Sequence, residues 1–224
     1  MAVNAAHNES KKKVVIYRDE MIVLYYKEVK LQFDKTKNEF FKNPKTGKLF
    51  LTTHRLIFLN ERKSDKMISL TMPYLNLKHL DMKQPIFGNN YIVGVIKPDN
   101  EDEVWSVSEE FRITINKGGT YELFRMIMDF KRDVAKQAKS DPQENDQPPS
   151  PPANKGPTDI FMFYNKYTLP EKERGNLLEM SDQPAPYPSV PMAVQVCVVI
   201  LSGPAAGAQS NQKVNSAKPF IMEH

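Results

Sequence analysis

Between residues 14 and 115 the chain alternates short apolar runs with turn residues, a pattern typical of β-strands. The clearest run is 111–115, in which every second residue is apolar, as in a half-buried strand. The runs that predict strands are 14–17, 22–26, 29–33, 48–51, 55–60, 67–72, 75–81, 91–96 and 111–115. The stretch 116–119 ends in two glycines and predicts a hairpin turn with positive φ angles, followed by a return strand at 120–123.

The hydrophobic period then changes to that of a helix. Leu123, Ile127, Phe130, Val134 and Ala138 are spaced by three or four residues, which predicts an amphipathic helix ending near residue 139. About nine strands followed by one helix indicate a mainly β fold, a strongly bent antiparallel sheet or barrel capped by a C-terminal α-helix.

Proline and charge divide the chain near residue 140. Thirteen of the 17 prolines follow it; the first 140 residues carry 25 Lys and Arg against 18 Asp and Glu, and the rest 6 against 9. We therefore predict a flexible N-terminal arm at 1–13, a basic folded domain at 14–139 and a Pro-rich, mostly disordered tail at 140–224. Within that tail, 160–167 is an aromatic island, and 193–201 is an apolar run whose role stays open.

Several classes of protein are excluded by what the sequence lacks. A single cysteine, Cys197, excludes a disulfide scaffold and a cysteine-based zinc site. No run is long enough for a transmembrane segment and none resembles a secretory signal, so we expect an intracellular protein. No spacing of histidines, glycines or acids matches a catalytic, metal or cofactor motif. We therefore expect a protein that is not an enzyme and has no cofactor.

A lysine-rich loop is the first positive signal. Its cations can contact an anionic lipid headgroup, although lysine is also common in ordinary solvated loops. The candidate anion-binding residues are Lys35, Lys37, Lys42, Lys45 and Lys48. Sequence-specific binding of nucleic acid is not expected, because no aromatic residues alternate with these lysines. Phe40-Phe41 in the same loop fits either a membrane-inserting wedge or a core contact.

The prolines of the tail are the second signal. Proline-rich segments are preorganised for docking into aromatic grooves, although a plain solvated linker has the same composition. One cluster holds two overlapping PxxP patterns, from Pro148, Pro149, Pro151 and Pro152. The other is Pro184-Ala185-Pro186-Tyr187, with prolines and a tyrosine at the spacing of a WW-domain ligand.

Three stretches resemble one family. Residues 47–58 (GKLFLTTHRLIF) are similar to the core signature of GRAM domains. The Met72-Pro73-Tyr74 motif and residues 83–92 (KQPIFGNNYI) resemble the segment that distinguishes the WW-domain-binding protein 2 family, which includes the postacrosomal sheath WW-domain-binding protein. The third stretch is 115–124 with the helix after it. The resemblance covers about residues 1–139.

The resemblance implies a pleckstrin-homology-like fold of seven strands and a C-terminal helix. It also implies an adaptor and transcription coactivator of nucleus and cytoplasm, which binds chromatin-associated partners and, through PPxY motifs, WW domains of ubiquitin ligases and Hippo-pathway coactivators. The sequence departs from this pattern because it has no Pro-Pro-x-Tyr; Ala185 stands at the second proline. A phosphoinositide-binding or anionic-membrane-binding module and a component of the sperm perinuclear theca are the alternatives.

Overall fold

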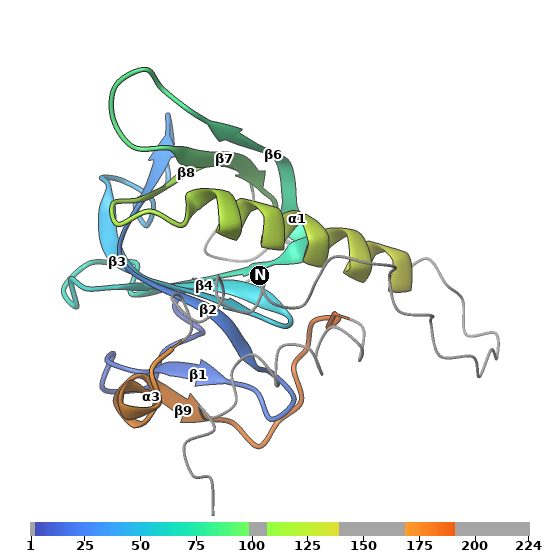
Figure 1. Ribbon diagram of the computed structural model, residues 1–224. Coiled ribbons are helices and arrows are strands. Elements are labelled where there is room, and N and C mark those ends of the chain that lie inside the picture. Colours follow the sequence, from blue (N-terminus) through green and yellow to red (C-terminus); the bar gives the residue numbers. More distant parts are fainter. Residues whose placement is uncertain (1–2, 99–106, 139–168, 191–224) are drawn as a thin grey trace, which may run out of the picture.

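The computed structural model describes residues 3–98, 107–138 and 169–190. Seven antiparallel strands form the main sheet in the order β5-β4-β3-β2-β8-β7-β6 (Figure 1). These strands are β2 (Ile22–Asp34), β3 (Lys45–Thr52), β4 (Arg55–Asn60), β5 (Ser69–Pro73), β6 (Leu77–Lys83), β7 (Tyr91–Ile96) and β8 (Glu109–Ile115). The sheet curls into a half-barrel, with β5 and β6 as its two edges.

Within the described residues, one helix packs on the concave side of this sheet. Helix α1 (Thr120–Gln137) contacts the 3-10 turn η1 (Tyr74–Asn76), which joins the two edge strands. Phe130 of α1 meets Tyr74 of η1 edge-on at 5.7 Å between ring centroids. The helix therefore fills the corner where the sheet stays open, and the predicted mainly β architecture, a bent antiparallel sheet capped by a C-terminal helix, is confirmed.

Two local predictions were wrong. The runs 22–26 and 29–33 are one strand, β2, interrupted by a register shift between Tyr26 and Val29 where Glu28 has a φ of 57°. The return strand at 120–123 does not form, because α1 begins at Thr120. Gly118 and Gly119 do adopt positive φ angles of 81° and 98°, but they turn the chain from β8 into a helix instead of a hairpin.

The predicted flexible arm at 1–13 is also corrected, since residues 3–13 pack on the sheet. The side chain of Ala6 is fully buried, and its N–H donates to the hydroxyl of Ser69 in β5 at 3.2 Å. The N–H of Asn4 donates to the carbonyl of Ser69 at 2.9 Å. These contacts continue into β1 (Val14–Ile16), so the N-terminal residues form part of a second layer.

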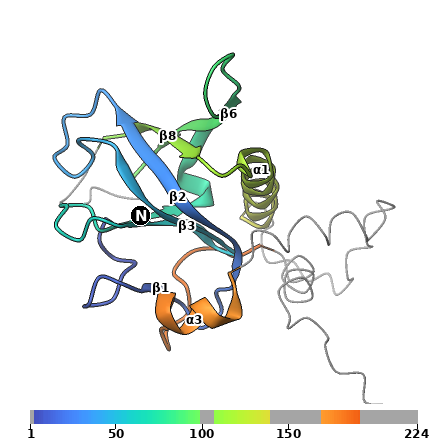
Figure 2. The same ribbon diagram turned by 60° about the vertical axis from the view of Figure 1, so that its left-hand side comes forward.

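One segment of the tail that the sequence predicts to be mostly disordered has defined secondary structure. Residues 169–190, here the tail segment, contain α3 (Glu171–Leu177) and β9 (Leu178–Met180), and β9 pairs with β1 in parallel. This layer lies on the side of the main sheet away from α1 (Figures 1 and 2). The predictions for 148–152, 160–167 and 193–201 fall outside the described residues.

Candidate functional site

The second layer meets the main sheet at a buried arginine. Arg55, the first residue of β4, donates to both carboxylate oxygens of Glu20 at 2.8 Å. Its guanidinium also donates to the carbonyl of Val15 at 3.0 Å and to the hydroxyl of Thr71 at 3.3 Å. One side chain therefore joins the segment around β1 to two strands of the main sheet, and a bidentate charge-assisted pair fixes its orientation.

Two tyrosine rings lie near the same guanidinium. The carbon at its centre is 4.5 Å from the ring centroid of Tyr17 and 5.7 Å from that of Tyr187. Both distances fall within the range of cation–π attraction. Tyr187 is the tyrosine that the sequence analysis assigned to the WW-like motif, and the structure places it against the domain.

The rest of this motif lies along the segment that follows β1. The N–H of Ala185 donates to Asp19 at 2.8 Å, while Pro184 and Pro186 are exposed. Val190, three residues after Tyr187, is fully buried, and its N–H donates to the carbonyl of Thr53 at 3.0 Å. The motif is therefore a surface feature with exposed prolines and a docked tyrosine.

A second candidate site is basic. Lys42, Lys45, Arg62 and Lys66, here the basic cluster, line two adjoining cavities of about 270 and 280 Å³ between the β2–β3 and β4–β5 loops. Cavities of this size are at the lower limit for ligand pockets and suit a small polar group such as a phosphate. The cluster therefore offers cations from two loops and from the first residue of β3 to an anion.

Acidic side chains already pair with three of these cations. Glu39 accepts from Lys42 and, at 2.9 Å, from Lys66; these two lysines lower the pKa of Glu39 to about 2. The buried ammonium of Lys45 pairs with Asp65 at 2.9 Å. Burial raises the pKa of Asp65, but hydrogen bonds from Lys45 and the N–H of Met67 outweigh it and lower the pKa overall.

The structure brings together only part of the predicted anion-binding set. Lys42 and Lys45 line the cavities, whereas Lys35, Lys37 and Lys48 do not. Lys48 lies instead near Lys63, whose pKa is lowered by burial and by that neighbouring charge. Arg62 and Lys66 were not among the predicted residues, although the polar stretch 60–66 carries three basic residues beside a turn.

Phe40 and Phe41 do not form an exposed wedge. Phe41 is fully buried with its ring 4.3 Å from that of Phe33, and Phe40 packs against the same core. The core-contact alternative is therefore the correct one, and it removes the main argument for membrane insertion by this loop.

Neither candidate site has the groups of a metal centre. Within 3–98, 107–138 and 169–190, no three His, Cys, Asp or Glu side chains gather in a way that can hold a metal ion. No helix in these ranges has the length and apolarity that a membrane span requires. The two candidate sites are built from cationic side chains, aromatic rings and backbone groups.

Known proteins with similar sequences agree with the resemblance inferred above. Over 130 residues, 57% of the chain, the sequence is 37% identical to human WW domain-binding protein 2. It is 30% identical over 131 residues to the postacrosomal sheath WW domain-binding protein of Macaca fascicularis. The resemblance to this family is therefore confirmed over that region. The chain spans about half the length of these curated relatives, 49% and 51%.

Two further comparisons match a different protein, Vps36. Residues 8–89 match the family described as vacuolar protein sorting protein 36, Vps36 of ESCRT-II. Among solved structures, the Vps36 N-terminal PH domain aligns with a TM-score of 0.44 and 15% identity, over 58% of this chain and 93% of that one.

Proposed function

We propose that this protein is a non-enzymatic adaptor that resembles WW domain-binding protein 2 and docks on protein partners. The observation that carries the proposal is the 37% identity, over 130 residues, to a protein named for WW-domain binding. Exposed Pro184 and Pro186 support it, since their rings are accessible to an aromatic groove. Coactivator activity, chromatin-associated partners and residence in nucleus and cytoplasm belong to the same proposal.

The departure from Pro-Pro-x-Tyr sets the expected affinity. Each proline of such a ligand packs on a ring and the tyrosine enters its own pocket, so Ala185 removes one contact. The loss of about 1 kcal/mol weakens binding roughly five- to tenfold. We therefore expect weak WW binding.

Retention on a panel of immobilised WW domains tests this proposal. The full chain should bind at least one domain, and Tyr187→Ala should reduce that binding at least fivefold. Tyr121→Ala is the matched control, because Tyr121 is an exposed tyrosine of α1 outside the motif. Background retention of all three proteins, or equal retention of wild type and Tyr187→Ala, contradicts binding through Tyr187.

The basic cluster favours a second candidate function, the binding of anionic lipid headgroups. Flotation with vesicles that contain phosphatidylserine or a phosphoinositide should recover the chain at low salt and less of it at high salt, as the screening length shrinks. Lys42→Glu with Lys66→Glu should abolish recovery, whereas Lys136→Glu on α1 serves as a control of equal charge change per site. Recovery that ignores the basic cluster contradicts this candidate.

A third candidate, a component of the sperm perinuclear theca, rests on the 30% identity to a postacrosomal sheath protein. Immunolocalisation in spermatids tests it, and absence of the protein from those cells removes it.

A further inference from the structure

The face of the main sheet away from α1 is apolar and covered. Its outward side chains form their own cluster, separate from the core under the helix. They come from β2, β3, β4 and the approach to β5 and comprise Tyr25, Phe50, Ile57, Leu59 and Ile68. The N-terminal segment covers them with Ala6, Val14 and Ile16, and the tail segment adds Leu169 and Leu177.

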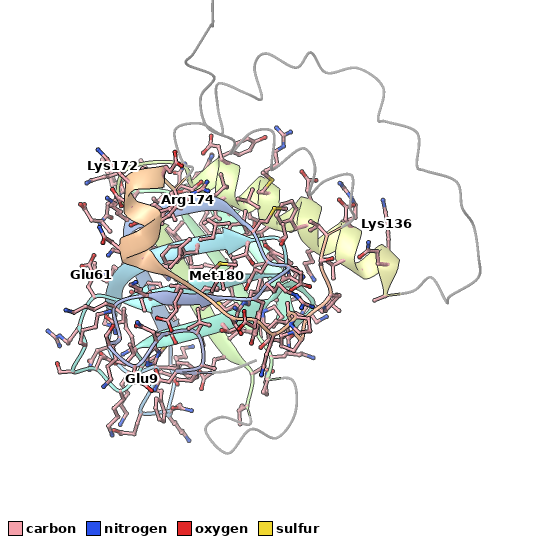
Figure 3. The ribbon with its side chains drawn as sticks, turned by 90° about the horizontal axis from the view of Figure 1, so that it is seen from below. Glu9, Glu61, Lys136, Lys172, Arg174 and Met180 are labelled. Atoms are coloured by element: carbon pink, nitrogen blue, oxygen red, sulfur yellow. The ribbon has the colours of Figure 1, made fainter. Side chains whose placement is uncertain are left out.

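The tail segment docks mainly through its backbone. In the parallel pair, Val14 lies opposite Leu178 and Ile16 opposite Met180. Past the strand, the N–H of Ser181 donates to the carbonyl of Ile16 at 2.7 Å, and the N–H of Arg18 donates to the carbonyl of Gln183 at 3.1 Å. Addition of an extended segment to a strand edge is a recurrent mode of peptide recognition. Figure 3 shows α3 and Met180 in front of the sheet in the view from below.

Few side chains of the tail segment are buried, and two exposed contacts add to them, Lys27 with Glu173 at 2.7 Å and Asn8 with Glu179 at 2.9 Å. Leu169, Leu177 and Val190 are its buried residues, and Tyr187 adds the contact with Arg55. All positions from 178 to 189 are half-buried or exposed. The apolar core under α1, in contrast, is built almost wholly from the domain and takes only Val190 from this segment. Such a small set of anchors suits reversible docking, since ordering an extended segment costs conformational entropy.

We propose that the face formed by β1, Tyr17, Asp19, Thr53 and Arg55 is a peptide-binding site, and that residues 178–190 are its exchangeable intramolecular ligand. The site recognises an extended strand by backbone pairing, a tyrosine by the guanidinium of Arg55 and an aliphatic side chain at the position of Val190. The same segment of a second copy of the chain meets all three requirements. This proposal does not depend on WW-domain binding.

Tethering explains why the site is filled by its own chain. A ligand joined to its site by a linker has an effective concentration on the order of millimolar, so a free segment of equal affinity competes poorly. Cutting the connection removes this advantage without altering any contact at the site. Exchange should therefore be slight in the intact chain and marked in the cut chain.

The test uses the full chain with a protease cleavage site inserted after Ser150 and a fluorescein-labelled peptide of residues 169–190. Fluorescence anisotropy should report peptide incorporation into the cut chain at a concentration at least tenfold below that needed for the intact chain. A peptide with Tyr187→Ala should bind at least fivefold more weakly. A peptide with Pro186→Ala is the matched control and should bind like the wild-type peptide, because Pro186 is exposed.

Three results would overturn the proposal. One is a cut chain that incorporates no peptide while circular dichroism and thermal unfolding report it folded. Another is a cut chain that unfolds, because the segment is then a fixed part of the core. The third is a Tyr187→Ala peptide that binds as tightly as the wild-type peptide. None of these results bears on retention by WW domains, which is measured on the uncut chain.

Discussion

The carboxylate of Glu20 accepts two hydrogen bonds of 2.8 Å from the guanidinium of Arg55, and both side chains are buried. Glu20 lies just before β2, whereas Arg55 begins β4. The hydroxyl of Thr52 donates a further hydrogen bond of 2.6 Å to the same carboxylate. Because water does not reach the pair, each charge depends on the other for its stability in the interior.

Neutralising one partner should therefore destabilise the fold strongly. Glu20→Gln leaves the Arg55 charge uncompensated, and we expect the free energy of unfolding to fall by about 3–5 kcal/mol. Urea denaturation followed by circular dichroism measures the change. Asp81→Asn is the control, since Asp81 pairs with Lys83 on the surface and should matter little. Equal effects of the two substitutions would contradict a buried, mutually dependent pair.

Gly47 permits the close approach of β3 and β4. It lies opposite Asn60, and a Cβ atom built on it would overlap the carbonyl group of Leu59. Gly47→Ala should therefore force the strands apart and cost about 1–3 kcal/mol of stability. Thermal unfolding measures the loss.

A glycine without such a neighbour gives the matched control. Gly175 of α3 has no atom within 4 Å of the position of a Cβ. Gly175→Ala should stabilise by about 0.5–1 kcal/mol, because alanine is the better helix former. The close approach at Gly47 is contradicted when Gly47→Ala unfolds at the wild-type temperature.

The sequence predicts the main sheet well because its strands are short apolar runs bounded by turn residues. The predicted boundaries 55–60 and 91–96 coincide with β4 and β7. The prediction of a return strand at 120–123 was wrong because Leu123 fits both a strand pattern and the helix pattern that continues to Val134. The longer pattern prevails, since α1 buries Leu123, Ile127 and Phe130 together.

Local sequence patterns could not predict the second layer. β9 has three residues, and its partner β1 lies at the other end of the chain, so neither period nor composition connects them. One signal was present in β4, where Ile57 and Leu59 are apolar on the face opposite to Leu56 and Phe58. A strand that is apolar on both faces indicates a covering layer on each side. Which segment forms the covering layer over Ile57 and Leu59 depends on contacts such as that of Tyr187 with Arg55, and no spacing in the sequence encodes these contacts.

The loop between β6 and β7 carries the most exposed large apolar side chains of the described residues. Ile86 is 93% exposed and Phe87 is 90% exposed, on a loop that extends away from the sheet (Figure 1). Since neither side chain packs on the core, Ile86→Ser with Phe87→Ser should leave the unfolding temperature within about 1 °C of wild type. Leu77→Ser, at a buried position of β6, should lower it markedly. A comparable loss in both variants would mean that the loop folds back onto the domain.

Two histidines, His7 of the N-terminal segment and His54 of the turn between β3 and β4, are partly and fully buried, respectively. His54 shares a hydrogen bond of 2.9 Å between its Nδ1 and the hydroxyl of Thr53, and its Nε2 lies 3.6 Å from the carboxylate of Asp19. Burial lowers the pKa of His54 below its ordinary value of 6.5, although Glu20 and Asp19 act in the opposite direction. Burial also lowers the pKa of His7, assisted by the charges of Lys11 and Lys63.

Lowered histidine pKa values make the fold sensitive to acid. Below pH 6.5 the unfolded chain binds protons that the folded chain accepts only at lower pH, so the free energy of unfolding should fall as the pH decreases from 7 to 5. The carboxylates with lowered pKa values, Glu39, Asp65 and Asp81, lose their contribution at still lower pH. His54→Gln should flatten the slope between pH 7 and 5, and His7→Gln together with it should flatten the slope further. Urea titrations at several pH values measure it, and a wild-type stability that stays constant over this interval would mean that both imidazoles titrate as they do in water.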